Sequence, residues 1–385
     1  MAKRIAFVHD LPLGGAFIAM VHFIKGLSQL GYDIDLYTLP DSNTKPFTKF
    51  VGHTYHFGIP QPTKDYRSPL HRLSRDFYTL IKEPQIEKRL AEDIDARKYD
   101  SVLVSHFRFL DAPYILRYLQ TPTVYYTHGG PRTYYEYELR VPENLPFYKY
   151  YYEAILRNIK AKADRQNARE ATVVATTSAF AASTIALWYG IDPQTTGLGV
   201  DAQFFTPLST PKKHQLLIVG NPEPQKAIDL AIHALGRLSR PPKLVIASPR
   251  QPPTHFLQTL ADKNRVTLVW KTGQNKTQMR LLYRQSLATL ALSYREHFGF
   301  SVVESLACAT PVIAVGEGAF PELVQDNRTG FLVDRSSSSV ADAIEHIVTD
   351  PKLAAKLGKS GRHWVRTHLP WSDAISRLDQ IIQRL

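Results

Sequence analysis

The chain has 385 residues, of which 44% are hydrophobic and 21% charged, and these values are typical of a soluble globular protein. This length exceeds that of one hydrophobic core and predicts two domains. The formal net charge of +12 at pH 7 is compatible with a phosphate-bearing ligand, an anionic membrane or nucleic acid as partner. Because the sequence has no arginine-rich run, zinc-finger pattern or aromatic RNA-binding motif, nucleic acid is disfavoured.

Cysteine usage and hydropathy indicate the compartment. The single cysteine, Cys308, excludes an internal disulfide and suits a reducing environment; its small apolar neighbours favour a buried helical residue over a nucleophile. The first apolar run is interrupted by His9 and Asp10, short of a signal sequence, and no window approaches the roughly 20 apolar residues of a membrane span. We expect a cytoplasmic protein, or one bound peripherally to the inner face of a membrane, and no metal site.

Apolar runs and helical periodicity alternate along residues 1–206. They predict strands at 4–9, 33–38, 101–106, 123–128 and 172–177, and helices at 16–30, 70–91, 147–169 and 180–188. This alternation is typical of a doubly wound, Rossmann-like α/β domain. Gly14 and Gly15 follow the first strand, where glycine lets a ligand approach the backbone at a helix N-terminus. The third glycine of a dinucleotide-binding loop is missing, which disfavours a dinucleotide.

The predicted strands at 101–106 and 123–128 both end in histidine. His106 and His128 therefore lie at the carboxyl edge of the sheet, where open α/β sheets bind their ligands. Taken alone, each is equally well explained as a histidine satisfied by loop carbonyl groups. Arg132, four residues after His128, either binds a phosphate or acceptor group or pairs with a surface carboxylate.

The predicted helix at 147–169 combines aromatic and basic residues. These are Tyr148, Tyr150, Tyr151 and Tyr152 with Lys149, Arg157, Lys160, Lys162, Arg165 and Arg169. Such a helix is able to lie on an anionic membrane. Alternatively, it is an amphipathic helix that packs its tyrosines and leaves its cations in solvent.

A second alternation begins after proline and lysine residues at 206–213. It predicts strands at 216–220, 243–248, 266–271, 288–293 and 311–315, and helices at 226–238, 277–286, 338–349, 351–368 and 371–385. We predict one domain at 1–206, a second at 207–368, and a C-terminal helix at 369–385. Lys226 opens a helix behind a strand and loop, where backbone N–H groups help it to bind an anion; a solvent-facing lysine is the alternative.

The segment 296–330 combines two glutamates, a helix, a strand and a Gly-Pro loop. Seven residues separate Glu296 from Glu304, so one carboxylate lies on the loop before the helix and the other within its early turns. Both can then face one ligand. Alternatively, Ser301 caps the helix and Glu304, three positions later, completes a capping box.

This segment resembles the donor-nucleotide signature of the retaining glycosyltransferases of family 4. In that family the glutamate pair precedes a Gly-Thr-Pro segment, a valine-rich strand and a Gly-Gly-x-Pro-Glu loop. The corresponding stretches here are Ala-Thr-Pro at 309–311 and Gly-Ala-Phe-Pro-Glu at 318–322. The resemblance covers nearly the whole chain and implies the GT-B fold: two Rossmann-like domains facing a cleft, with the C-terminal helix crossing back to the first domain.

The resemblance also implies functional residues. The donor-binding set is Gly14, Gly15, Asn221, Lys226, Glu296, Phe298, Gly299, Phe300, Ser301 and Glu304. Glu304 would accept hydrogen bonds from the ribose, and Lys226 would bind the diphosphate. Glu296 would contact the sugar and support an oxocarbenium-like centre, and His128 would orient the sugar from the first domain.

Two motifs depart from the family pattern. Asn221 stands where the family has an arginine that clamps the diphosphate, so another cation, such as Arg250 or Lys271, would have to replace it. The segment after His128 is similar to the His-Thr-Pro-x-Arg-aromatic motif of a subset that includes mannosyltransferases. This similarity makes Arg132 and Tyr134 candidates for binding the acceptor, together with His106 at the end of the earlier strand.

The implied reaction moves a hexose, mannose or glucose, from a GDP- or UDP-sugar to a glycan, a lipid-linked molecule or a small molecule. Family membership implies retention at the anomeric carbon. Because no carboxylate is clearly placed as a nucleophile, we expect front-face attack with the departing phosphate as base, without metal or cofactor. The alternative is a non-catalytic GT-B protein that binds a sugar nucleotide or polyanion, since Asn221 removes one phosphate clamp. A phosphorylase is disfavoured because no context for a pyridoxal lysine is present.

Overall fold

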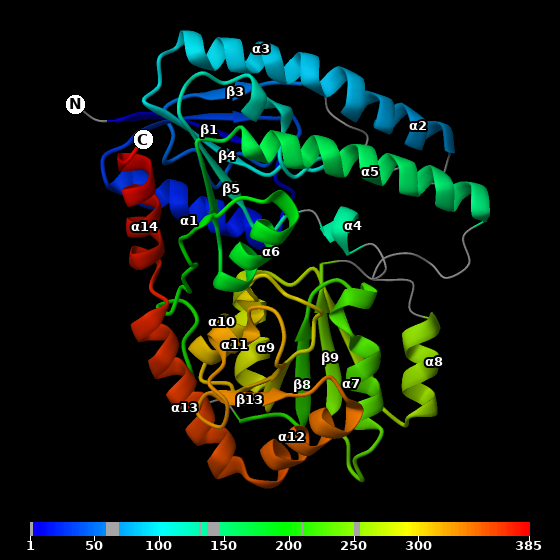
Figure 1. The fold of residues 1–385 in the computed structure, drawn as a ribbon. Coiled ribbons are helices and arrows are strands. Elements are labelled where there is room, and N and C mark those ends of the chain that lie inside the picture. The colour runs from blue at the N-terminus through cyan, green and yellow to red at the C-terminus, as the bar shows by residue number, and fades with distance from the viewer. Residues whose placement is uncertain (1–2, 59–68, 131, 137–145, 209–210, 250–254) are drawn as a thin grey trace. The chain divides into compact units, whose positions relative to one another are not determined.

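A computed structural model describes residues 3–58, 69–130, 132–136, 146–208, 211–249 and 255–385 (Figure 1). The chain divides into two compact units. The first unit comprises Met1–Gly197 and Ser372–Leu385, and the second comprises Leu198–Trp371. Among the described residues, no helix is long and apolar enough to cross a membrane.

The first unit is built on a seven-stranded sheet whose paired strands are all parallel, in the order β3-β2-β1-β4-β5-β6-β7. The strands are β1 (Arg4–His9), β2 (Asp33–Thr38), β3 (Thr54–His56), β4 (Ser101–Ser105), β5 (Thr123–Thr127), β6 (Val173–Thr176) and β7 (Gln194–Thr195). Because β1 pairs with β2 on one side and β4 on the other, the strand order reverses at β1. Ligands of such sheets bind at the carboxyl ends of the strands flanking that point.

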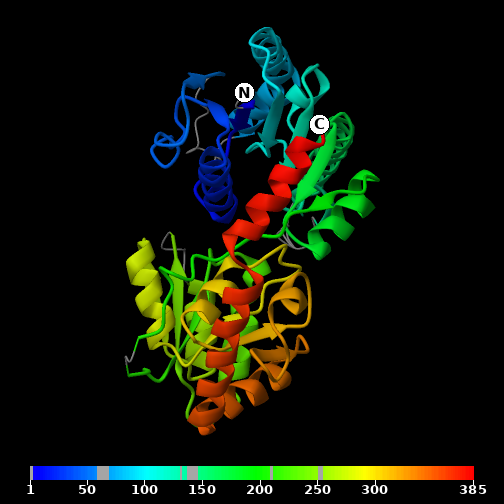
Figure 2. The same cartoon turned by 90° about the vertical axis from the view of Figure 1, so that its left-hand side faces the viewer.

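Helices cover both faces of this sheet. They are α1 (Gly15–Gln29), α2 (Pro69–Phe77), a π-helical turn (Tyr78–Lys82), α3 (Glu83–Ala96), a 3-10 helix (Tyr114–Arg117), α4 (Arg132–Tyr135), α5 (Phe147–Arg169), α6 (Ala179–Tyr189) and α14 (Trp371–Gln383). Ile94 of α3, Ala168 of α5 and Ile185 of α6 share one core cluster with alternate strand residues. On the other face, Gly26 of α1 lies so close to Ile375 of α14 that an added Cβ would overlap it, and Figure 2 shows α14 among the elements of the first unit.

The second unit is built on a six-stranded parallel sheet in the order β10-β9-β8-β11-β12-β13. Its strands are β8 (Gln215–Val219), β9 (Lys243–Ser248), β10 (Leu268–Thr272), β11 (Ala288–Ala291), β12 (Val312–Val315) and β13 (Gly330–Val333). The helices are α7 (Ile228–Leu235), α8 (His255–Lys263), α9 (Lys276–Gln285), α10 (Phe300–Ala307), α11 (Phe320–Leu323), α12 (Ser337–Thr349) and α13 (Pro351–His368). The order reverses at β8, which lies between β9 and β11.

The predicted architecture of two doubly wound α/β domains is confirmed, and the chain returns to the first unit in α14. Several elements differ in detail. The single helix predicted at 70–91 consists of α2, the π-helical turn and α3, and the short strands β3 and β7 and the helix α8 were not predicted. Strands of two or three residues carry too little alternation for a sequence pattern to detect them.

The first unit ends at Gly197, whereas the sequence places the boundary at 206. Residues 198–206 belong to the second unit because they pair with its C-terminal segment. The Val200 amide donates to the carbonyl oxygen of Leu369 at 2.9 Å, and Arg362 Nη1 donates to the carbonyl oxygen of Phe205 at 2.9 Å. The return to the first unit occurs after Trp371 rather than after 368.

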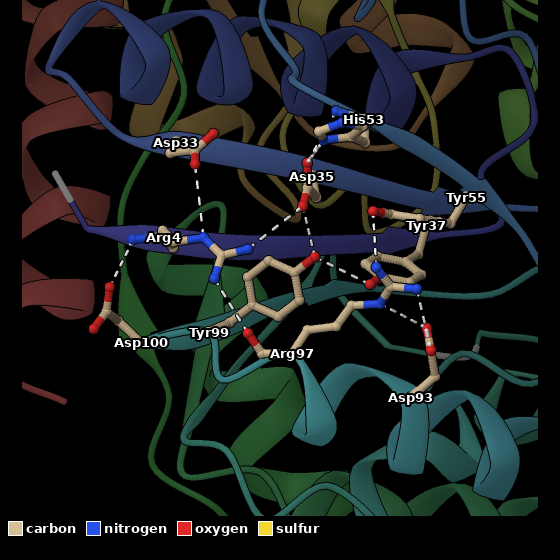
Figure 3. Close-up of polar contacts among 10 residues, drawn as sticks. All are labelled: Arg4, Asp33, Asp35, Tyr37, His53, Tyr55, Asp93, Arg97, Tyr99 and Asp100. Atoms are coloured by element: carbon tan, nitrogen blue, oxygen red, sulfur yellow. Dashed lines mark hydrogen bonds and ion pairs between the residues drawn. The ribbon is translucent and has the colours of Figure 1, made fainter.

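A buried polar cluster lies at the amino ends of β1, β2 and β4, the edge opposite to the one where ligands are expected (Figure 3). Tyr99 donates from its hydroxyl to Asp35 Oδ2 at 2.7 Å and lies 3.0 Å from the hydroxyl of Tyr37. The amide of His53 donates to Asp35 Oδ1 at 2.9 Å. Burial raises the pKa of the Tyr99 phenol well above its usual range, so the phenol stays protonated and donates to the carboxylate.

Replacing Tyr99 by phenylalanine is expected to lower the free energy of unfolding of the first unit by about 1–3 kcal/mol, because the buried Asp35 carboxylate loses a hydrogen-bond donor. Urea denaturation of the full chain measures this change. Tyr55→Phe is the matched control, since that phenol contacts Arg97 in a half-buried position at the rim of the cluster. An unchanged unfolding midpoint for Tyr99→Phe would show that Asp35 does not depend on this donor.

Candidate functional site

Lys226 and Glu296 form an ion pair at the carboxyl edge of the second sheet. Lys226 Nζ donates to Glu296 Oε2 at 2.7 Å, and the two side chains are 22% and 24% exposed. Lys226 follows β8 and Glu296 follows β11, strands that are far apart in the chain but adjacent in the sheet. The reversal of strand order at β8 therefore unites a cation and a carboxylate where such sheets bind their ligands.

The position of Lys226 depends on a tight turn. Pro224–Lys226 is a 3-10 helix, and Ala227, which precedes α7, has a left-handed φ of 47°. The lysine stem crosses Gly220 so closely that a Cβ on Gly220 would lie 2.8 Å from Lys226 Cε. Only glycine at this position allows the stem to lie across the loop.

Glu296 is held through its backbone. The amide of Ala319 donates to the carbonyl oxygen of Glu296 at 2.8 Å. A Cβ on Gly318, whose φ is +64°, would lie 2.6 Å from the Glu296 amide nitrogen. Arg295, directly before Glu296, has a left-handed φ of 43°, a conformation that is costly for a residue with a side chain. The loop is therefore held in one conformation, which fixes the backbone position from which the Glu296 side chain extends.

Glu304 lies on α10, as predicted, and its partner is a tyrosine of α9. The Tyr283 hydroxyl donates to Glu304 Oε2 at 2.7 Å. Burial raises the pKa of Glu304 to about 7, and the hydrogen bond from Tyr283 and the charge of Lys276 oppose that rise. Lys276 in turn pairs with Asp201 at 2.9 Å. The carboxyl group is thus poised between its two protonation states near neutral pH.

The capping role considered for Ser301 and Glu304 is wrong. The N-cap of α10 is Gly299, with a left-handed φ of 104°, and no side-chain cap is present. Glycine makes the turn that a serine cap would otherwise complete, and the Glu304 carboxylate is engaged by Tyr283 instead. Phe298 is buried, with its ring 5.2 Å from that of Phe300, so both rings support the loop by packing.

Of the cations considered as replacements for the family arginine, the one that the structure describes, Lys271, does not lie at this site. Asn221 is exposed on the loop after β8. Lys271 is exposed on β10, the edge strand, which β9 separates from β8. Arg250 lies outside the described residues. Lys226 is therefore the cation that the described part of the second unit places beside Glu296.

The first unit brings His106 and His128 together at the carboxyl ends of β4 and β5. Their rings lie 5.3 Å apart, edge to face. Burial lowers the pKa of His106 to about 4, so it is neutral at physiological pH. Gly14 is the N-cap of α1, which begins at Gly15 rather than at the predicted residue 16, and no side chain caps the amide groups of this helix N-terminus.

Asp10 and Arg108 form a second ion pair, which the sequence did not reveal. Arg108 Nη2 lies 2.9 Å from Asp10 Oδ1, and its Nη1 lies 3.5 Å from Asp41 Oδ2. Burial raises the pKa of Asp10 to about 7, although the charge of Arg108 opposes the rise. Asp10 follows β1 and Arg108 follows β4, so this pair occupies the switch point of the first sheet. Strand order, which no local pattern encodes, brings them together.

The two other acceptor candidates have protein partners. Arg132 pairs with Glu136, the residue that directly follows α4, and both side chains are largely buried. The hydroxyl of Tyr134 donates to the carbonyl oxygen of Phe109 at 2.8 Å, and burial raises its pKa well above the usual range. Of the two interpretations of Arg132, the structure shows the pairing with a carboxylate, in the interior rather than at the surface.

Two family models match the chain in succession. The model described as Glycosyltransferase Family 4 matches residues 13–204, and the model described as Glycosyl transferases group 1 matches residues 200–364. The D-inositol 3-phosphate glycosyltransferase of Thermobifida fusca is 29% identical over 220 residues, which are 50% of each chain. A GDP-mannose-dependent α-(1-6)-phosphatidylinositol monomannoside mannosyltransferase of Mycolicibacterium smegmatis is 34% identical over 88 residues, 23% of each chain. The matched region is thus half or less of the length of these curated relatives.

Solved structures share the fold over the full chain. Sucrose-phosphate synthase of Thermosynechococcus elongatus has a TM-score of 0.76 at 18% identity, covering 99% of this chain and 98% of its own. HepE of Anabaena, solved in complex with UDP and glucose, has a TM-score of 0.74 at 14% identity and full coverage of both chains, 100%. At these identities the likeness establishes the architecture alone.

Proposed function

Because this chain belongs to family 4 of the GT-B glycosyltransferases, as the adjoining matches over 13–204 and 200–364 show, we propose that it transfers a hexose from a nucleoside-diphosphate sugar to an acceptor hydroxyl. The observation that carries the proposal is the ion pair of Lys226 and Glu296 at the switch point of the second sheet. Glu304, on the helix that follows, adds the second carboxylate of the donor site.

The donor roles follow from the chemistry of these groups. Glu304 has one oxygen engaged by Tyr283, and its carboxylate form accepts hydrogen bonds from ribose hydroxyls. Lys226 stabilises the negative charge that grows on the departing diphosphate. Glu296, which Lys226 holds in place, contacts the hydroxyls of the sugar. We assign this charge stabilisation to Lys226 and backbone amides rather than to a metal.

The reaction breaks the bond between the anomeric carbon and the diphosphate oxygen and forms one to the acceptor oxygen. We assign retention of configuration: the acceptor oxygen attacks the anomeric carbon on the same face from which the phosphate leaves. An oxygen of the departing phosphate takes the proton of the acceptor hydroxyl. His128 is assigned to the sugar, and His106, whose ring lies 5.3 Å from that of His128, to recognition of a glycan or lipid-linked acceptor by the first unit. Relatives that use GDP-mannose and a fold neighbour bound to UDP-glucose support GDP and UDP as donor nucleotides, and mannose and glucose as sugars.

Calorimetric titration of the full chain with UDP and GDP, followed by a donor-turnover assay with UDP-glucose and GDP-mannose, tests this function. We expect micromolar binding of one nucleotide and slow release of its sugar, unaffected by EDTA. Binding without turnover, even with a lipid extract as acceptor, would support the non-catalytic alternative. Binding of neither nucleotide would contradict the assignment of a donor site to the second unit.

We further propose that α5 and α2 place the first unit against an anionic membrane. Phe147, Tyr151 and Ile155, spaced one turn apart on α5, are 75%, 63% and 59% exposed. α2 and the turn after it add Phe77 and Ile81, 56% and 48% exposed, and Figure 1 shows the two helices running side by side. Lys149, Lys162 and Arg165 of α5 are exposed. Of the two acidic residues of this helix, Glu153 is neutralised by Arg72 and Asp164 is fully buried.

Replacing Phe147, Tyr151 and Ile155 together by alanine is expected to weaken binding to phosphatidylcholine vesicles containing phosphatidylglycerol about tenfold or more, because apolar area and cationic attraction both contribute to such binding. Vesicle co-sedimentation measures it. Phe256→Ala is the matched control, as this phenylalanine of α8 is 72% exposed on the second unit. Equal sedimentation of all proteins, or no sedimentation of the wild type at low salt, would contradict the membrane assignment.

A further inference from the structure

Arg335, just after β13, makes hydrogen bonds with all three nitrogen atoms of its guanidinium group. Nε and Nη2 donate to the two carboxylate oxygens of Glu317 at 2.8 and 2.7 Å. Nη1 donates to the carbonyl oxygen of Leu292 at 2.8 Å, and Nη2 to that of Ser293 at 3.2 Å. The guanidinium carbon also lies 3.7 Å from the ring centroid of Tyr294. A side chain that is 16% exposed thus makes four hydrogen bonds with its three nitrogen atoms.

These contacts join the carboxyl ends of three neighbouring strands. β11, β12 and β13 pair in parallel, side by side. Residues 292–294 follow β11, Glu317 follows β12 and Arg335 follows β13. One planar guanidinium therefore fixes the spacing of the three loops that leave this edge of the sheet, and two of these loops build the surroundings of Glu296.

One end of this cross-link reaches Glu296 along the backbone, and the other reaches it through one backbone hydrogen bond. On one side, Tyr294 lies two residues before Glu296, and its amide donates to the carbonyl oxygen of Gln225 at 2.8 Å, beside Lys226. On the other side, Glu317 begins the turn whose Ala319 amide donates to the carbonyl oxygen of Glu296 at 2.8 Å. A shift of Glu317 relative to the end of β11 would move the Glu296 carboxylate away from Lys226.

We infer that Arg335 is a positioning residue for sugar transfer, which holds Glu296 in register with Lys226 by bracing the loops after β11 and β12. This inference rests on the proposed function, because its effect appears in turnover. It assigns Arg335 no contact with the substrate. Small displacements of reacting groups reduce rates steeply, by about 10²-fold for 1 Å, so a brace remote from the substrate has a kinetic consequence.

Lysine cannot replace this arginine. A single ammonium group is able to pair with Glu317, but it lacks the planar fork that reaches the carboxylate and two carbonyl oxygens at once. Nucleotide affinity is expected to be independent of the brace, because Glu304 lies on α10 and is held by Tyr283 of α9. We therefore expect Arg335 to affect the position of the Glu296 carboxylate but not the binding of the nucleotide.

The test compares Arg335→Met and Arg335→Lys with the wild type, using UDP-glucose or GDP-mannose, whichever the wild type turns over. We expect Arg335→Met to lower kcat about 10- to 100-fold with nucleotide Kd nearly unchanged, and Arg335→Lys to restore only part of the rate. Because loss of the hydrogen bonds of Arg335 is expected to lower the melting midpoint as well, kinetics are measured well below the midpoint of each variant. Arg328→Met, at an exposed arginine of the same unit, is the matched control and should match the wild type.

A double-mutant cycle separates positioning from a general loss of structure. In a Glu296→Gln background, measured by single turnover, the penalty of Arg335→Met should shrink to about twofold or less, because the group it positions is gone. Full turnover by Arg335→Met, or an undiminished penalty in the Glu296→Gln background, would overturn the inference while the proposed function stands. No turnover by the wild type would overturn both.

Discussion

Replacing Lys226 by methionine is expected to lower kcat about 10²- to 10³-fold, the usual cost of removing one charge-stabilising donor from an active site. Lys226 is 2.7 Å from Glu296, and exposed Asn221 stands where the family has a second cation. The leaving diphosphate would therefore depend on Lys226 more than in relatives that retain the arginine. The substitution also leaves Glu296 without its cationic partner, which adds to the loss.

Steady-state kinetics of Lys226→Met, Lys226→Arg and Lys263→Met check this expectation. Lys226→Arg keeps the charge and should recover part of the rate. Lys263, exposed at the end of α8, is the matched lysine control and should leave kcat unchanged. A kcat for Lys226→Met within threefold of the wild type would mean that another group carries the diphosphate charge.

Replacing Glu304 by alanine is expected to weaken nucleotide binding about 100-fold, because hydrogen bonds to a charged acceptor contribute roughly 1.5–3 kcal/mol each. Isothermal titration with the nucleotide that binds the wild type measures this change. Glu322→Ala, at an exposed glutamate of α11, controls for removal of a negative charge. Undiminished affinity in Glu304→Ala would contradict the ribose assignment.

The same group should make binding of the nucleotide depend on pH. Burial raises the pKa of Glu304 from 4.5 to about 7, so the accepting carboxylate prevails above pH 7 and the neutral acid below it. Affinity should therefore fall as the pH drops from about 8 to 6. Tyr283→Phe removes a hydrogen bond that favours the charged form, so the midpoint should move to higher pH. Glu304→Gln should bind weakly with a flat profile, and a slope that persists in it would assign the titration to another group.

Local patterns in the sequence determined most elements of the fold, because a helix or strand carries its own periodicity and end signals. The helix Ala179–Tyr189 is an example: Ser178 Oγ accepts from the Ala181 amide at 3.0 Å, and Gly190 closes the helix with a φ of 68°. The spacing of Glu296 and Glu304 likewise placed one carboxylate on a loop and the other on the following helix. These are short-range properties, which a few neighbouring residues specify.

Tertiary structure decided which of these elements became neighbours. Strand order set β8 beside β11 and β1 beside β4, and so paired Lys226 with Glu296 and Asp10 with Arg108. Packing of α9 against α10 put Tyr283 on Glu304 in place of a capping role. Arg335 joined loops from three strands for the same reason. Because side-chain pairs of this kind depend on how whole strands and helices are stacked, no local pattern along the chain contains them.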